Sequence, residues 1–214
     1  MRFTEMKGEY KMSKSVSTKV LVQLALLTGV EIVFAFTPLG SIPIGPIVAT
    51  LAHIPVIIAA VAIGTGAGVY MGALFGLLSM IVHTITPTIT SFVFTPFYTA
   101  GSVSGGVYSV IICFIPRILL ALSATAIYKL MVKKAKPVIS AAVAGAVSSL
   151  IHTALVLGGI YLFFGESYAE AIGQAHELLI GLIMTTVLTN GIPEAIAAAI
   201  VIAALVVPLK KLQQ

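Results

Sequence analysis

Residues 106–132 read GVYSVIICFIPRILLALSATAIYKLMV, and this stretch decides the fold class. It is apolar over a length that can cross a membrane, because a hydrocarbon core of about 30 Å takes roughly 17 to 25 helical residues. Further apolar stretches, each bounded by polar residues, glycine or proline, cover residues 18–36, 46–63, 64–85, 137–164 and 178–207. The sequence therefore predicts an all-α membrane protein with six transmembrane helices.

The composition of the whole chain agrees with lipid as the solvent. Of the 214 residues, 59% are hydrophobic and 9% are charged, and the mean hydropathy is +1.12. A soluble domain carries roughly 25% charged residues, so this class is excluded. The net charge of +5 does not indicate nucleic-acid binding, because the basic residues are confined to a few places. The single cysteine, Cys113, excludes an internal disulfide and a cysteine metal cage.

The positions of lysine and arginine predict the orientation. Eleven of the twelve lie before or at the start of the first span, at or near the connection between the fourth and fifth, or at the C-terminus, and Arg117 is the exception. Short cytoplasmic loops retain such residues, and an even number of spans puts all three groups on one side. We therefore expect a multi-pass protein of the cell membrane with a cytoplasmic tail at 1–17, a six-helix transmembrane domain at 18–209 and a cytoplasmic tail at 210–214. The first apolar stretch is long and five more follow, so we interpret it as a span rather than a cleaved signal peptide.

Small residues recur at helical spacing in two of the predicted spans. The third has glycine at every fourth position, and the fifth has a comparable stripe; the residues are Gly64, Gly68, Gly72, Gly76, Ala141, Ala144, Gly145 and Ser148. Such faces permit close helix approach in lipid, and we expect them to pack inside this chain rather than against a partner.

Three ionisable residues lie inside predicted spans: Glu31, Arg117 and Glu194. A charge in lipid is costly unless it is paired or faces water, so each is a functional hypothesis. Arg117 lies roughly 16 Å deep at 1.5 Å per residue, and a guanidinium is always charged and binds carboxylates in a two-pronged geometry. Two interpretations stay open: a receptor for an anionic ligand, or an internal ion pair with Glu31 or Glu194.

The sixth stretch contains TNGIPE at residues 189–194. Its proline removes a backbone donor and its glycine loosens the turn before it, so we expect an irregular helix there. Freed carbonyls, the Asn190 amide and the Glu194 carboxylate would then offer hydrogen bonds at membrane depth, to a ligand or to neighbouring helices. His53, His83 and His152 lie in or at the ends of spans without a metal-binding spacing, and we expect no cofactor.

The connection at residues 86–105 has eight Thr or Ser, three Phe, one Tyr, two Pro and no charge. This mixture favours a segment that folds over a cavity, with an interfacial loop among lipid headgroups as the alternative. Enzyme signatures are missing from the chain: it has no phosphate-binding G-x-x-x-x-G-K-[ST] loop, no H-E-x-x-H and no aspartate. We therefore do not expect an enzyme.

Five short stretches carry a resemblance to a known family. They are TLAHIPVI at 50–57, FVFTPF at 92–97, CFIPRIL at 113–119, GGIYLFFG at 158–165 and TNGIPEA at 189–195. In these stretches the chain resembles the substrate-binding S components of energy-coupling factor (ECF) vitamin transporters, over roughly residues 18–207. Within the family it is most similar to the pantothenate-specific members.

The resemblance implies six transmembrane helices with both termini cytoplasmic, and a vitamin receptor closed by the outer loops. It implies partners as well: a transmembrane coupling subunit and two cytoplasmic ATPases, since this chain has no ATP-binding motif of its own. A small-residue patch on the first helix meets the coupling subunit in the family, and Ala25 and Gly29 are the nearest match here. The family resemblance also implies that the whole subunit topples in the membrane to carry its site inward.

For the vitamin itself, the resemblance makes Arg117 the leading candidate for the pantothenate carboxylate. Asn190 and Glu194 would serve the amide and hydroxyls, and His152 and Tyr161 are weaker candidates. Phe94 and Phe97 belong to the loop that would cover the site. An S component for another vitamin, a self-sufficient proton-coupled secondary transporter and a scaffolding membrane protein without a ligand remain as alternatives.

Overall fold

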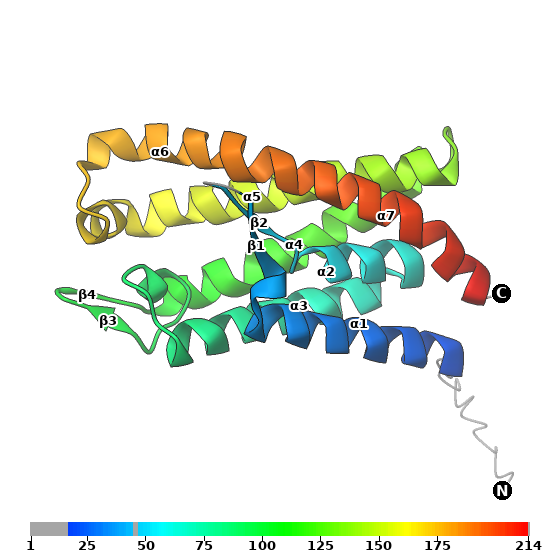
Figure 1. Cartoon of the computed structure of the whole chain (residues 1–214), viewed down its shortest axis with the longest axis horizontal. Helices are drawn as coiled ribbons and strands as arrows, with labels where there is room; N and C mark the ends of the chain where they lie inside the picture. Colours follow the sequence, from blue (N-terminus) through cyan, green and yellow to red (C-terminus); the bar gives the residue numbers. More distant parts are fainter. Residues whose placement is uncertain (1–16, 45–46, 214) are drawn as a thin grey trace, which may run out of the picture.

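The computed structural model describes residues 17–44 and 47–213 as a bundle of helices (Figure 1). The α-helices are α1 (Thr18–Phe36), α2 (Ile54–Ile58), α3 (Thr65–Ile85), α4 (Val107–Met131), α5 (Pro137–Ala171), α6 (Leu179–Thr186) and α7 (Ile192–Gln213). Residues 1–16 of the predicted N-terminal tail at 1–17 lie outside the described residues. The predicted C-terminal tail, in contrast, is helical as far as residue 213.

Shorter elements join or interrupt these helices. Three are 3-10 turns: η1 (Pro38–Gly40), η3 (Ser91–Val93) and η4 (His176–Leu178). Two are π-helical, η2 (Ala59–Ile63), which continues α2, and η5 (Val187–Gly191), which joins α6 to α7. Two antiparallel pairs of strands complete the fold, β1 (Ser41–Ile44) with β2 (Ile47–Thr50) and β3 (Thr99–Ala100) with β4 (Val103–Ser104).

The number of full-length spans differs from the prediction. Within the described ranges five helices are long and apolar enough to cross a membrane: Thr18–Phe36, Thr65–Ile85, Val107–Met131, Pro137–Ala171 and His176–Leu212. The stretch predicted at 46–63 is helical only over Ile54–Ile63, which rises about 15 Å. Its first part instead forms β2, and Pro55 lies in the first turn of α2, where a missing N–H is tolerated. The prediction of six complete spans is therefore not confirmed.

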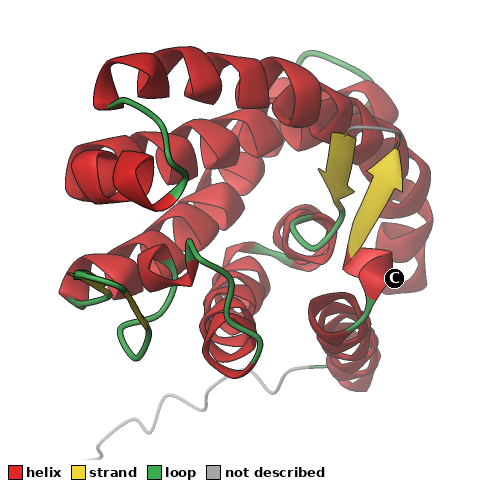
Figure 2. Cartoon of the chain, turned by 60° about the vertical axis from the view of Figure 1, so that its left-hand side comes forward, coloured by secondary structure: helices red, strands yellow, loops and turns green. Residues whose placement is uncertain are grey.

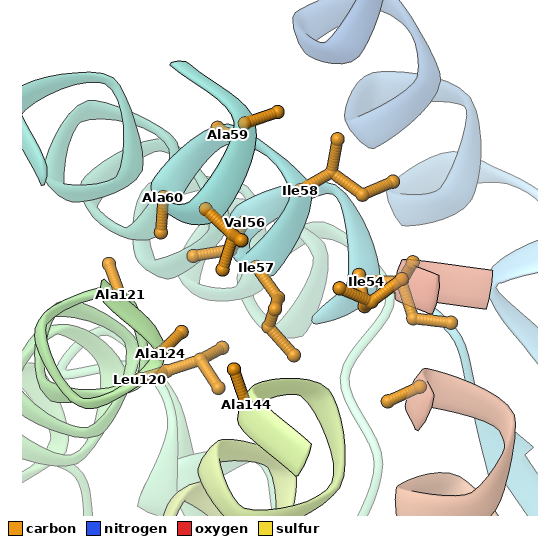
Figure 3. Close-up of a cluster of buried hydrophobic side chains, with 14 of the residues drawn as sticks. Ile54, Val56, Ile57, Ile58, Ala59, Ala60, Leu120, Ala121, Ala124 and Ala144 are labelled. Atoms are coloured by element: carbon orange, nitrogen blue, oxygen red, sulfur yellow. The ribbon is translucent and has the colours of Figure 1, made fainter. Parts of the chain in front are cut away.

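The short helix α2–η2 forms the centre of the bundle. Its residues from Ile54 to Ala62 are buried, and Val56, Ile57 and Ala59 have no exposed surface. Figure 3 shows Val56, Ile57 and Ala60 on the side of the helix that faces α4 and α5, where the labelled residues are Leu120, Ala121, Ala124 and Ala144. High hydropathy in this segment therefore reflects burial in protein rather than contact with lipid.

Glycines bring the longer helices close together, as predicted from their spacing. A Cβ added to Gly68 would lie 2.6 Å from the Cβ of Ala60, and one on Gly72 would lie 2.5 Å from the carbonyl oxygen of Arg117. A Cβ on Gly145 of α5 would come within 2.9 Å of the carbonyl oxygen of Ala198 in α7, so the backbones of these two helices are in close contact. Lipid gives helices no hydrophobic reason to associate, so such backbone contacts supply the packing.

The chain begins α1 and ends α7 at the same end of the bundle, whereas β3–β4 and the α5–α6 connection lie at the other end (Figure 1). The β1–β2 hairpin crosses the bundle from the end of α1 toward η5 and α7, and the turned view places it among the helices as well (Figures 1 and 2). This hairpin and the residues 86–105 are therefore the two connections that can wall a site.

The close approach of α3 and α4 can be tested with one methyl group. We expect Gly72→Ala to destabilise the protein by about 1–3 kcal/mol, the usual effect of overpacking, because the new Cβ meets the backbone of α4. Gly66→Ala is the matched control, since a Cβ there has nothing within 4 Å and alanine is a better helix former. Thermal unfolding followed by circular dichroism in detergent measures both. Equal stability of the two variants would contradict this account of the packing.

Candidate functional site

A cavity of about 210 Å³ lies inside the bundle, and we call it the central cavity. Its lining residues are Thr50, His53, Phe75, Arg117, His152, Thr153, Val156, Leu157, Thr186, Asn190 and Glu194. They come from the end of β2, the turn before α2, and from α3, α4, α5, α6, η5 and α7. Polar groups therefore converge from several elements on one concave space, which is the usual form of a small-molecule site.

The order of Pro116 and Arg117 in α4 determines where the guanidinium lies. Proline has no N–H, so the carbonyl of Ile112, four residues earlier, loses its helical donor. Nη1 of Arg117 donates a hydrogen bond to that carbonyl instead. The side chain is thereby held along its own helix, and only 5% of Arg117 is exposed. A charge at this depth is thus placed by the backbone defect next to it.

Two aromatic rings hold the same guanidinium from different elements. Its Cζ lies 5.1 Å from the ring centroid of Phe75 on α3 and 5.7 Å from that of Phe94, which follows η3. The faces of such rings attract cations, and more strongly when water is excluded. Attraction to a ring does not neutralise the charge, however, so the guanidinium remains a cation inside the protein.

Arg117 forms neither of the internal ion pairs that the sequence left open. Among the described residues, both carboxylate oxygens of Glu31 lack a hydrogen-bond partner, although Glu31 has no exposed surface. Glu194 instead accepts a hydrogen bond from the backbone N–H of Thr50. Nε of Arg117 also has no partner in the described part of the chain. The central cavity is therefore lined by a cation that forms no ion pair with any described residue, although Glu194 lines the same cavity.

The helix irregularity expected at residues 189–194 is confirmed as the π turn η5, with Pro193 just after it. Oε1 of Glu194 accepts the Thr50 N–H at 2.8 Å, which fixes the end of β2 against α7. The Thr189 hydroxyl donates to Oδ1 of Asn190 at 3.1 Å. A π turn changes the direction of side chains relative to an α-helix and is frequent at functional sites. Here Asn190 and Glu194 both line the central cavity.

Two histidines, His53 before α2 and His152 on α5, lie side by side in the wall of the central cavity. The rings of His53 and His152 stack at 6.3 Å, and Phe75 lies 6.0 Å from His152. Nε2 of His53 is hydrogen-bonded to the Ser149 hydroxyl at 3.1 Å, the interhelical role expected of a membrane histidine. Nε2 of His152 is buried and has no partner among the described residues. No cluster of three or more metal-ligating side chains occurs in that part of the chain.

A second cavity, of about 250 Å³, adjoins the first on the α1 side of Arg117. The two cavities share Thr50, Phe75 and Arg117. Phe94 and His83 line only the second, and their rings stack at 4.6 Å. The guanidinium therefore lies in a partition between two spaces, with Phe94 on one side of it.

The segment at residues 86–105 packs into the bundle. Phe92 and Val93 have no exposed surface and pack with Ile112, Ile160 and Phe164. This packing favours a segment that covers a cavity over a loop lying in the headgroups.

The structure brings most of the predicted site residues together. Arg117, His152, Asn190 and Glu194 line the central cavity, and Phe94 contacts Arg117 from the second cavity. Two predicted residues lie elsewhere: the ring of Tyr161 stacks on His176 at 5.7 Å, and Phe97 is 74% exposed. Neither lines either cavity.

Several lining residues escaped sequence reasoning. Phe75 is one phenylalanine among ten, and only its place three residues after Gly72 indicates a face turned toward α4. Thr50 contributes a backbone N–H to Glu194, and no residue pattern signals such a contact. Ala25 and Gly29, the predicted partner patch, are exposed on α1, and a Cβ on Gly29 would have nothing within 4 Å.

The fold and cavity define a class: an apolar bundle of helices long enough to span a membrane, around a polar cavity lined by a guanidinium that has no ion pair among the described residues. The family model described as "ECF transporter, substrate-specific component" matches residues 19–206. The chain therefore belongs to the substrate-specific components of ECF transporters, which are transport subunits of the membrane and not enzymes.

Two known proteins show the same relationship. The chain is 34% identical over 205 residues to the pantothenic acid transporter PanT of Lactococcus lactis subsp. cremoris (strain MG1363), covering 94% of this chain and 97% of that protein. The crystal structure of the S component for biotin from an ECF-type ABC transporter aligns with a TM-score of 0.51 at 17% identity. It covers 89% of this chain and 94% of the other, and supports the fold alone.

The contact between Glu194 and Thr50 makes a prediction about the hairpin. Glu194→Ala removes the acceptor for the Thr50 N–H, so amide hydrogen exchange at residues 47–51 should become at least tenfold faster. Glu194→Gln keeps a carbonyl oxygen at the same place and should leave exchange within about threefold of the parent. Mass spectrometry of the detergent-solubilised protein measures both. Equal exchange in the two variants would show that Glu194 does not hold β2.

Proposed function

We propose that this chain binds pantothenate in the central cavity and delivers it inward as the substrate-specific subunit of an ECF importer. The observation that carries the proposal is the buried guanidinium of Arg117, which has a cavity on either side and no counter-ion among the described residues. A buried cation of this kind is stabilised by an anion that enters with the ligand. The name of the relative PanT supports pantothenate as that ligand.

In this proposal the carboxylate of pantothenate binds Arg117 in the two-pronged geometry that guanidinium favours. The amide and hydroxyl groups lie against Asn190 and Glu194, and the unpartnered Nε2 of His152 offers a further hydrogen bond. Phe94 covers the guanidinium from the loop side. The apolar side chains of Val156 and Leu157 leave room for the methyl groups of the ligand.

The proposal includes the arrangement in the membrane. The buried α2–η2 segment takes the place of the sixth membrane helix, and both termini lie in the cytoplasm of the cell membrane, as the lysine and arginine positions predict. A transmembrane coupling subunit and two cytoplasmic ATPases supply the ATP hydrolysis. Ala25 and Gly29 give α1 an exposed small-residue face on which a helix of the coupling subunit can pack closely.

The role of Arg117 can be tested by equilibrium binding to the purified protein. We expect Arg117→Ala to lower pantothenate affinity at least tenfold, and Arg117→Lys to be impaired as well, because a point charge does not replace a planar fork. Leu130→Ala, an exposed position on the same helix, should bind like the parent. A neutral pantothenate analogue without the carboxylate should bind the parent at least tenfold more weakly than pantothenate. Unchanged affinity in Arg117→Ala would remove this residue from the site, and tight binding of another vitamin would change the ligand.

The role of the exposed α1 face in transport can be tested separately from ligand binding. Gly29→Leu adds a large side chain where a Cβ has open space, so pantothenate binding by the isolated subunit should stay within about twofold of the parent. ATP-dependent uptake in proteoliposomes that contain the coupling subunit and ATPases should fall at least tenfold. Gly158→Leu, another glycine with open space on α5, is the control and should transport normally. Uptake by the chain alone, without ATPases, would instead favour a secondary transporter.

A further inference from the structure

The second cavity is the larger of the two spaces that Arg117 lines, and the proposed function places no part of pantothenate in it. Its volume is about 250 Å³, and its walls come from α1, the base of the β1–β2 hairpin, α3 and α4. α1 contributes Phe34 and Ala35, and α3 contributes Ser79 and His83. A polar space therefore lies beside the buried cation, on the side away from the proposed vitamin.

The guanidinium of Arg117 needs a counter-ion even when the site holds no vitamin. Only 5% of Arg117 is exposed, and Nε has no partner among the described residues. Nη1 donates to the carbonyl of Ile112, which is a neutral group and leaves the positive charge in place. A buried charge is costly unless an opposite charge pairs with it. The empty receptor therefore attracts an anion from solution to this residue.

The two cavities beside Arg117 differ in charge. The lining of the central cavity includes the carboxylate of Glu194, so an inorganic anion there is repelled as well as attracted. Among the described residues that line the second cavity, none carries a carboxylate. Glu31, the other carboxyl on this side, is buried in α1 and does not line the cavity. A small anion is therefore better matched to the second cavity than to the central one.

The size and polarity of the second cavity suit an ion that keeps part of its hydration shell. A volume of 250 Å³ has room for an ion together with several water molecules, since water takes about 30 Å³ per molecule in the liquid. The hydroxyl of Ser79 and the ring of His83 add polar groups to the lining, and Nδ1 of His83 is held by the Ser91 hydroxyl at 3.0 Å. Retained water lowers the cost of taking a charge into the protein.

We propose that the second cavity binds a small monovalent inorganic anion, with chloride as the probe, which is the counter-ion of Arg117 while no vitamin is bound. Pantothenate differs from such an ion because its hydroxyl groups can donate to Glu194, which suits the vitamin to the central cavity. Two anions on one guanidinium repel each other, so chloride and the pantothenate carboxylate bind antagonistically. This antagonism rests on the proposed function, whereas the anion site rests on Arg117 and the second cavity alone.

The antagonism can be measured by equilibrium binding of pantothenate to the purified protein in detergent. The starting buffer is sodium HEPES, whose sulfonate is too bulky to substitute for chloride, and chloride replaces it stepwise up to about 0.15 M. Ionic strength stays constant, so the screening of charges does not change. The dissociation constant of pantothenate should rise at least threefold in the parent, because chloride must leave Arg117 before the carboxylate binds.

Two variants fill the second cavity from different helices. Ala35→Leu on α1 and Val82→Phe on α3 enlarge side chains that line the second cavity and not the central one. Without chloride, both should bind pantothenate within about threefold of the parent. With chloride, their dissociation constants should change by less than about 1.5-fold. Ala154→Leu on α5 is the matched control, since Ala154 lines neither cavity, and it should keep the chloride dependence of the parent.

Bromide gives the position of the ion directly, because it substitutes for chloride and has an anomalous X-ray signal. Crystals of the vitamin-free parent grown in bromide should show an anomalous peak against Arg117 in the second cavity, and crystals of Ala35→Leu should show none. A parent without chloride dependence, an equal dependence in the filled variants, or a parent crystal without the peak would overturn the anion site. Absence of pantothenate binding in chloride-free buffer would instead overturn the proposed function, and the bromide peak would still decide the anion site.

Discussion

The unpaired guanidinium of Arg117 is the constraint on which the rest of the site depends. Pro116 frees the Ile112 carbonyl, and that carbonyl positions the guanidinium. The ring of Phe75 can reach it because Gly72, one turn earlier on α3, lies against the backbone of Arg117 itself. A single close contact between two helices thus places both the charge and the ring that covers it.

Irregular backbone at membrane depth is stable only where protein or a polar cavity satisfies it. Both π turns meet this condition in different ways. In η2 the carbonyl of Ala60 accepts a hydrogen bond from the Thr125 hydroxyl at 3.1 Å, among the buried apolar side chains that surround α2–η2. In η5 the irregular turn borders the central cavity, and Asn190 is turned into it. The first irregularity is filled by packing, whereas the second leaves polar groups available to a ligand.

Hydropathy predicted the long helices because lipid contact demands apolar residues over a full span. The full span predicted at residues 46–63 is not confirmed, since burial in protein demands the same residues as lipid does, and α2–η2 is the most enclosed helix of the described chain. Arg117, Asn190 and Glu194, which line the central cavity, were predicted because polar groups are rare in such a sequence. Tyr161 and Phe97 were placed at the site by resemblance, but helix rotation and loop path, which the sequence does not encode locally, direct them elsewhere.

In the proposed function, the same electrostatics that favour pantothenate binding at Arg117 oppose its release. A pocket that pairs Arg117 with a ligand carboxylate discriminates strongly against a neutral analogue, because the cation would be left buried and unpaired. Inward release meets that same cost, since the departing anion leaves the guanidinium without a partner until water reaches it. Binding therefore needs no energy source, whereas unloading needs a change in the walls around Arg117. Under the proposed function such a receptor depends on partners that do work on it, which agrees with the chain's membership of the substrate-specific components of ECF transporters.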